Sequence, residues 1–277
     1  MTIPGAGSGR ASPGANGARP SRRGFACSGA IAAGDVARLA HAAEDLGFSS
    51  FWVTVLRDVT DPITVLRAAL GATAEITVGL GLIPLDAFAV TELAPRLDDV
   101  GRRAIIGLGV GRRRLAPDDF WTAGARRLRA DAPRVRIAVG SYSPLVLRAG
   151  GALADAALLN WMTPARVRWA ERQLDEGARA AGRGCGPSDS YVYLPTAIGG
   201  DAQRTIDAAL TGMAGHGYHR RHQAAIGSTP SLGMAIQTGA GSDPSLPDYG
   251  PRTETVVWPL GQDVEVHRAI LESCSPG

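Results

Sequence analysis

The sequence contains no lysine, so arginine supplies all 29 of its basic Lys and Arg residues. The formal net charge is +3, because 26 acidic residues are interspersed with the arginines. No basic stripe carries interleaved aromatic residues, which make up 5% of the chain, so the basic excess does not indicate nucleic-acid binding. With abundant Ala and Gly, the absence of lysine is typical of a GC-rich genome.

Cysteine is scarce, and long hydrophobic runs are missing. Cys27, Cys185 and Cys274 are an odd number, lie far apart and form no CxxC pair. Neither a disulfide framework nor a zinc site is therefore expected, and a reducing cytoplasm is the predicted compartment. No run approaches the roughly 20 apolar residues that span a bilayer, so we expect no membrane contact.

The N-terminal segment allows two interpretations. The stretch "SRRGFACSGAIAAG", residues 21–34, resembles a twin-arginine export signal, because an Arg pair precedes a mildly apolar stretch. Glycine interrupts this stretch, however, and Asp35 follows almost at once. We favour a disordered Pro/Gly/Ser/Ala-rich tail over residues 1–22, followed by a single domain over residues 23–277.

Helix and strand signals alternate along that domain. Asp35 is positioned to cap a helix that Gly47 ends, and the aromatic, β-branched strand 49–54 follows. The cycle repeats with Asp61 as a cap before Pro62 and with the strand 76–83.

Further signals complete a set of eight strands in alternation with roughly eight helices. Helices are predicted over about 87–100, 118–130, 144 onwards, 164–181 and 264–274. The expected strands are residues 25–28, 49–54, 76–83, 104–111, 135–140, 156–161, 191–199 and 253–259. Eight βα units in about 250 residues favour a (β/α)8 TIM barrel of the α/β class over an open sheet. The loops after the strands then share one face, where barrel active sites lie.

The stretch "AIIGLGVGRRR", residues 104–114, contains glycines in the spacing GxGxG. A dinucleotide fingerprint needs GxGxxG between a strand and a helix, so we interpret the stretch as a barrel strand. Alternate strand residues share a face, and glycines there either admit a flat ring or relieve crowding inside the barrel. The pattern alone does not decide between these two roles.

Several stretches in order resemble the luciferase-like monooxygenase family of flavin- or deazaflavin-dependent (β/α)8 oxidoreductases. The most specific are "ITVGLGLIPL", "IIGLGVG" and "LLNWMTP". In that family a non-proline cis peptide after the third strand forms a bulge behind the cofactor ring. The resemblance places this bond at Gly81–Leu82.

The resemblance also predicts the other cofactor-binding residues. The cofactor phosphate would lie at "GSYSP", where Ser141 and Ser143 add donors to a helix N-terminus, although Ser143 is alternatively an ordinary N-cap. Tyr142 would stack on the ring, donate a proton or simply pack, and Asn160 would hydrogen-bond the ring's polar edge. Thr54, Gly109 and Gly111, at or just after the ends of their strands, complete the predicted set.

Other residues near the predicted mouth keep two interpretations each. Arg112, Arg113 and Arg114 would pair with the anions of coenzyme F420 or form a solvated loop. Trp161 would line a substrate pocket, although packing is favoured. Three histidines in "HGYHRRH" lack a completing acid and the spacing of a metal site, so we expect no metal. His41 and His267 are predicted to be surface residues.

The chain departs from many deazaflavin-dependent relatives in two respects. The stretch 52–61 lacks the usual histidine, so Asp58 or Arg57 would have to replace it, or the proton comes from water or substrate. The catalytic acid is therefore unassigned. The segment between the fourth and fifth strands is also short, and residues 211–252 form a long connection that is the candidate lid.

The leading hypothesis is an oxidoreductase that transfers hydride between F420 and a small organic substrate. The alternatives are a reduced-FMN-dependent monooxygenase and a cofactor-free barrel that binds a metabolite or partner. A homodimer is expected by analogy with relatives. The sequence identifies neither the substrate nor the direction of the reaction.

Overall fold

The computed structural model describes residues 22–57, 61–113, 115–214, 233–237 and 245–276. The predicted tail therefore lies outside the described residues, except for Arg22. So do Asp58, Arg114 and the stretch "HGYHRRH".

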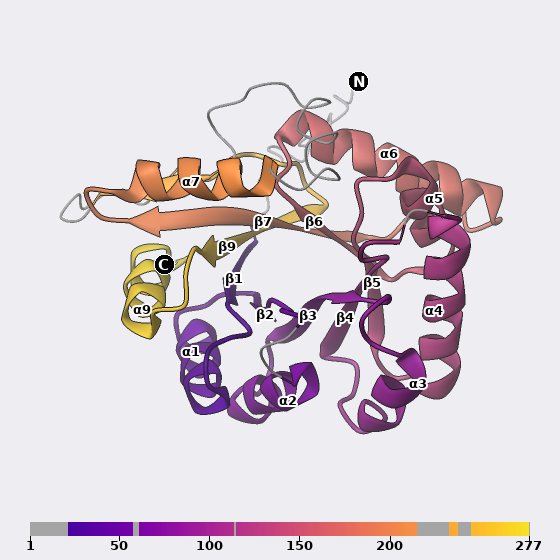
Figure 1. Ribbon diagram of the computed structural model, residues 1–277, viewed down its shortest axis with the longest axis horizontal. Helices are drawn as coiled ribbons and strands as arrows, with labels where there is room; N and C mark the ends of the chain where they lie inside the picture. The colour runs from indigo at the N-terminus through magenta and orange to yellow at the C-terminus, as the bar shows by residue number, and fades with distance from the viewer. Residues whose placement is uncertain (1–21, 58–60, 114, 215–232, 238–244, 277) are drawn as a thin grey trace, which may run out of the picture.

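Eight parallel strands form a closed barrel, as predicted (Figure 1). Each strand pairs with its neighbour from β1 through β7, and β9 pairs with both β7 and β1, which closes the ring. The barrel strands are β1 (Arg23–Cys27), β2 (Ser50–Val53), β3 (Thr77–Pro84), β4 (Ala104–Gly109), β5 (Arg136–Val139), β6 (Ala156–Asn160), β7 (Asp189–Ile198) and β9 (Thr253–Pro259).

A further strand, β8 (Met234–Ile236), was not predicted. It pairs with Thr196–Ile198 of β7, beyond the last pair that β7 makes with β6 at Tyr193. The strand therefore extends the sheet at the carboxyl end of the barrel. It belongs to the connection predicted as a lid, of which residues 211–214, 233–237 and 245–252 are described.

The helices lie around the outside of the ring of strands (Figure 1). They are α1 (Ala33–Asp45), α2 (Pro62–Ala72), α3 (Val90–Leu93), the 3-10 helix η1 (Ala94–Arg96), α4 (Pro117–Asp131), α5 (Pro144–Leu153), α6 (Pro164–Ala180), α7 (Ala202–Ala214) and α9 (Val264–Ser273). Among the described helices, none combines the length and the apolar content that a bilayer crossing requires.

Helix starts follow the predicted caps in most places. The Asp61 side chain accepts a hydrogen bond from the Thr64 amide, and Gly47 has φ +81° after α1. The prediction for Asp35 is wrong, because α1 begins two residues earlier and Asp35 forms an ion pair with Arg38 inside the first turn. An acid there still interacts favourably with the helix dipole.

Two further predictions are corrected. The helix expected over residues 87–100 is only a short α3 followed by η1, since Pro95 lacks the amide hydrogen that a continuing α-helix needs. His267 is fully buried in α9 rather than exposed, and its Nδ1 lies 2.7 Å from the Asp263 carbonyl oxygen. His41 is on the surface, as predicted.

The hydrophobic core has two layers. An outer layer lies between the strands and the helices. An inner cluster fills the barrel and consists of Ala26, Trp52, Ile105, Ala138, Ala156, Leu158, Tyr191, Tyr193 and Val256. Side chains alternate between the two faces of a strand, so every second residue points into the barrel.

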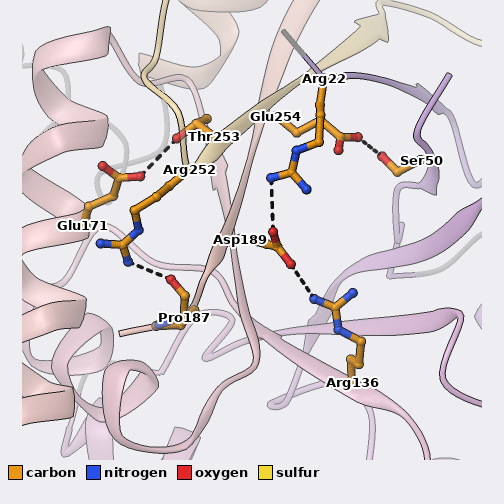
Figure 2. A network of polar contacts seen from close by, with 9 residues as sticks. All are labelled: Arg22, Ser50, Arg136, Glu171, Pro187, Asp189, Arg252, Thr253 and Glu254. Carbon is orange, nitrogen blue, oxygen red and sulfur yellow. Dashed lines mark hydrogen bonds and ion pairs between the residues drawn. The ribbon is translucent and has the colours of Figure 1, made fainter. Parts of the chain in front are cut away.

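Polar side chains close the amino-terminal end of the barrel (Figure 2). The Asp189 carboxylate bridges Arg22 and Arg136, at 3.1 and 2.8 Å. Close by, the Ser50 hydroxyl donates to the buried Glu254 carboxylate. The functional site must therefore be sought at the other end.

Candidate functional site

A cavity of about 210 Å³ opens at the carboxyl ends of β3, β4, β5 and β6. Three glycines contribute to its wall. The lining residues are Leu82, Pro84, Gly109, Val110, Gly111, Gly140, Ser141, Tyr142, Leu158 and Asn160. Barrel enzymes carry their active sites at this end, so the cavity is the candidate site.

Six of the nine predicted cofactor-binding residues line this cavity. Of the remaining three, two are adjacent in sequence to lining residues, and the third does not line the cavity. Gly81 directly precedes Leu82, and Ser143 follows Tyr142. The Thr54 hydroxyl instead accepts a hydrogen bond from the Gly29 amide at 3.2 Å, which ties the loop after β1 to the end of β2.

The third strand is irregular near its carboxyl end. The Gly81–Leu82 peptide bond is cis, at the position predicted from the sequence. The register between β3 and β4 shifts between Leu80 and Ile83, so the chain bulges there. The bulge brings Leu82 to the cavity wall.

The spaced glycines make room for Leu82. A Cβ atom on Gly107 would lie 3.0 Å from Leu82 Cδ2, and one on Gly109 would lie 3.4 Å from Leu82 Cδ1. A Cβ atom on Gly140 would lie 2.9 Å from Leu82 Cγ and would overlap both terminal methyl groups. We call these three residues the glycine socket. Gly107 and Gly140 therefore relieve crowding by Leu82, and Gly109 and Gly140 also form cavity wall, whereas the admission of a flat ring stays a prediction.

The serine-rich turn lies at one side of the cavity. The Ser143 amide donates to Ser141 Oγ at 3.0 Å, and Pro144 is the first residue of α5. Ser143 occupies the N-cap position, but its side chain makes no capping hydrogen bond. The position of Ser143 as N-cap residue thus agrees with the alternative interpretation, and whether the turn binds a phosphate stays a prediction. Ser141, which is largely buried, lines the cavity together with Tyr142.

Asn160 ends β6 beside the same cavity. Its Oδ1 atom is buried and has no hydrogen-bond partner in the described part of the chain. A buried amide oxygen without a partner is costly, so it is a natural acceptor for a ligand N–H group. The next residue, Trp161, has φ +52° and packs edge-on against Trp258, with ring centroids 5.9 Å apart. This packing agrees with the favoured prediction for Trp161.

The loop after β4 is held by Asp86. Its carboxylate forms an ion pair with Arg57 and accepts a hydrogen bond from the Arg112 amide at 2.8 Å. Gly111 has φ +65°, and any Cβ atom there would overlap the Asp86 carboxylate, so glycine is needed at this position.

The arginines of that loop differ in their surroundings. The Arg113 guanidinium lies 4.5 Å from the centre of the Phe120 ring, and its Nε donates to the Leu115 carbonyl at 3.2 Å. Arg112 is exposed, and Arg114 is not described. Arg113 thus has partners of its own, whereas the side chain of Arg112 faces solvent.

No histidine lies among the residues that line the cavity. Arg57, predicted as one replacement for a catalytic histidine, is paired with Asp86, and Asp58 is outside the described residues. Tyr142 is the titratable side chain on the cavity wall. Within the described ranges, His, Cys, Asp and Glu side chains form no group of three that could hold a metal ion.

Sequence reasoning missed several residues of the site. Pro84, Val110, Gly140 and Leu158 line the cavity, and each lies within two residues of one that was predicted. Tyr193 was also missed, although its hydroxyl lies 3.4 Å from the Gly81 carbonyl oxygen. The alternation in "YVYLP" already places Tyr191 and Tyr193 on one face of β7.

The fold and this site define an α/β barrel with a glycine-walled cavity at the carboxyl end of its sheet. Residues 9–117 match the family model described as luciferase-like monooxygenase. The family resemblance read from the sequence is thereby confirmed.

Individual proteins show a similar resemblance. The chain is 27% identical over 210 residues to a 5,10-methylenetetrahydromethanopterin reductase of Methanolobus tindarius. That alignment covers 63% of this chain and 64% of the reductase, which is less than two thirds of the relative's length.

Two solved structures share the fold. An F420-dependent secondary alcohol dehydrogenase in complex with an F420–acetone adduct superposes with a TM-score of 0.68 at 13% identity, over 92% of this chain and 99% of that chain. The oxygenating constituent of 3,6-diketocamphane monooxygenase from Pseudomonas putida, in complex with FMN, gives a TM-score of 0.54 at 13% identity, over 75% and 76% of the two chains. At these identities the likeness concerns the fold alone.

Proposed function

We propose that this protein is an oxidoreductase that transfers hydride between the deazaflavin F420 and a small organic substrate. The observation that carries the proposal is the cavity itself, which combines a glycine wall, a serine-rich turn and the unpartnered Asn160 oxygen. The F420-dependent alcohol dehydrogenase described above supports the choice of cofactor, and the reductase relative supports a redox reaction.

The residues present fit such a group. Leu82, Gly109 and Gly140 offer an apolar wall with a single side chain, that of Leu82, against which a planar ring would lie. Asn160 Oδ1 accepts a hydrogen bond from a ring N–H, which supplies the partner that the atom lacks within the chain. The turn at Ser141–Ser143 precedes α5, and its position suits a phosphate group because the helix N-terminus favours negative charge.

The deazaflavin supplies hydride chemistry when bound, and the protein's contribution is orientation. The bulge at Leu82 would support one face of the ring, so that substrate would approach the other face. No described side chain of the cavity is an obvious strong acid, so substrate protonation is assigned to water or to Tyr142.

The second candidate is a reduced-FMN-dependent monooxygenase. The FMN complex with the same fold favours it, and the serine turn would serve the FMN phosphate equally well. The third hypothesis, a cofactor-free barrel that binds a metabolite, is motivated by the missing histidine and by the pairing of Arg57 with Asp86.

Titration of the purified protein with F420 and, separately, with FMN distinguishes the three. Changes in each cofactor's absorbance and fluorescence give its dissociation constant. Tight binding of F420 with weak binding of FMN is the expected result. The reverse order supports the monooxygenase, and binding of neither cofactor at concentrations up to about 1 mM, the weak end of specific affinity, overturns both cofactor-dependent functions.

A further inference from the structure

The bulge that carries Leu82 rests on two aromatic residues that do not line the cavity. Trp52 of β2 and Tyr193 of β7 both belong to the inner cluster of the barrel. Their rings meet edge to face, with centroids 6.1 Å apart and an interplanar angle of 80°. Such a geometry is favourable for aromatic pairs.

Trp52 lies directly beneath the third strand. A Cβ atom on Gly79 would overlap the indole ring, so the strand can pass this close to the ring only with glycine at this position. A Cβ atom on Gly81 would lie 3.7 Å from Trp52 Cζ3, which is ordinary contact distance. The indole therefore sets how far β3 can sink toward the barrel axis just before the bulge.

Tyr193 approaches the bulge from another strand. Its hydroxyl donates to the Gly81 carbonyl oxygen at 3.4 Å. Burial holds the pKa of Tyr193 well above its usual range, so the phenol keeps the proton that it donates. This hydrogen bond gives the carbonyl of the bulge a partner inside the barrel.

Hydrogen bonds at the amino-terminal end of the barrel, which we call the polar floor, fix the orientation of Trp52. Its Nε1 donates to Ser50 Oγ at 2.9 Å, and the Ser50 hydroxyl in turn donates to Glu254. Ser50 and Glu254 lie in the polar floor (Figure 2). A chain of contacts thus runs from Glu254 through Ser50 and Trp52 to the bulge.

We infer that Tyr193 and Trp52 are positioning residues that set the height of the bulge and so the width of the cofactor cavity. The inference rests on the proposed function. If the bulge sinks or tilts, Leu82 leaves the glycine socket and enters the cavity. A cavity that is correctly shaped for only part of the time binds its ligand more weakly in proportion.

The test compares Tyr193→Phe and Trp52→Phe with the control Tyr191→Phe. Tyr191 lies on the same strand, faces the same interior and is closer to Trp52, with ring centroids 4.7 Å apart. Its substitution also removes a phenolic hydroxyl, but among the described residues it is Tyr193, and not Tyr191, whose hydroxyl bonds to Gly81. F420 and FMN are the probes, and each variant is titrated at a temperature where circular dichroism shows it to be folded.

Tyr193→Phe is expected to weaken binding of the cofactor by about threefold, because the hydrogen bond is long and such bonds contribute at the lower end of about 0.5–1.5 kcal/mol. Trp52→Phe, which also loses its link to Ser50 and part of the support, should weaken it by about tenfold. Both variants should change the absorbance band of the bound cofactor, since the ring then meets an altered wall. Tyr191→Phe should leave affinity and band unchanged.

The outcomes separate this inference from the proposed function. If the wild-type protein binds neither F420 nor FMN, both are overturned. If the wild-type protein binds a cofactor and Tyr193→Phe and Trp52→Phe match it, only the positioning role is overturned. Equal losses in Tyr193→Phe and Tyr191→Phe also overturn it, because they would reflect general loosening of the barrel interior.

Discussion

The side chain of Leu82 occupies the space that a Cβ atom on Gly140 would need. Such an atom would lie 2.9 Å from Leu82 Cγ and would overlap the terminal methyl groups. Leu82 is only partly buried and borders the cavity, so its methyl groups can move in that direction. This relationship links the size of residue 140, which directly follows β5, to the shape of the site.

Gly140→Ala should therefore close part of the cavity without unfolding the barrel. Displacement of Leu82 costs less than about 2 kcal/mol of stability, the usual range for modest overpacking. Cofactor affinity should fall by more than about tenfold, since Leu82 then competes with the ring. Isothermal titration calorimetry measures the affinity. The double variant Gly140→Ala/Leu82→Ala removes the displaced leucine side chain from the cavity and should recover part of the lost cofactor affinity.

The serine turn gives an electrostatic prediction. Ser141→Asp places a carboxylate where we propose the cofactor phosphate, so affinity should fall by more than about tenfold and should recover partly at high salt, which screens the repulsion. Ser141→Asn has a similar shape without the charge and is the matched control. If the two variants bind the cofactor equally well at low salt, the phosphate does not lie at this turn.

We expect Asp61 to stabilise the folded state at neutral pH and to lose this contribution in acid. Hydrogen bonds from Arg96, chiefly, and from Thr64 lower the pKa of Asp61 from its ordinary 3.8 to about 2, against the opposing effect of burial. The folded state thus favours the carboxylate. Its contribution is complete above about pH 4 and is lost as the pH falls toward 2. The pair is partly exposed, so the effect is small.

Two variants separate the charge of Asp61 from its capping role. Asp61→Asn keeps an acceptor for the Thr64 amide and should flatten the loss of stability between pH 4 and 2. Asp61→Ala also removes the cap and should cost about 1 kcal/mol more at neutral pH. Urea denaturation at a series of pH values checks both, and an unchanged slope in Asp61→Asn would contradict the assignment.

We expect the contribution of Glu254 to the free energy of unfolding to depend on pH in the opposite direction. Burial raises its pKa above the ordinary value of 4.5, while the hydroxyls of Ser50 and Ser49 and the charge of Arg22 oppose the shift. The folded state then holds the proton more tightly than the unfolded chain does. The stability due to this group is full below pH 4.5 and declines as the pH rises through the raised pKa.

Glu254→Gln should remove that decline, because the amide keeps an acceptor for Ser50 without a charge to bury. Relative to the wild type, the variant should gain stability between about pH 4.5 and 7. Differences in unfolding free energy between the two proteins, measured pH by pH, cancel the titration of His267 and other groups. A difference that does not vary with pH would show that Glu254 is ionised as readily in the folded state as in the unfolded one.

The sequence by itself determined the barrel and the outline of the site. Alternating apolar strands and capped helices are local signals, and the caps at Asp61 and Thr163 are made by their own segments. The position of the Gly81–Leu82 bond followed from the family resemblance. These features need no knowledge of distant contacts.

Only the tertiary structure decided what the spaced glycines do. Their role depends on Leu82, which reaches Gly107 and Gly109 on β4 and Gly140 just after β5. The burial of His267 and the support of the bulge by Tyr193 likewise join segments far apart in the chain. Periodicity places a side chain on a face of its own strand or helix, but the neighbour that it meets there depends on the register and closure of the barrel, which no local pattern records.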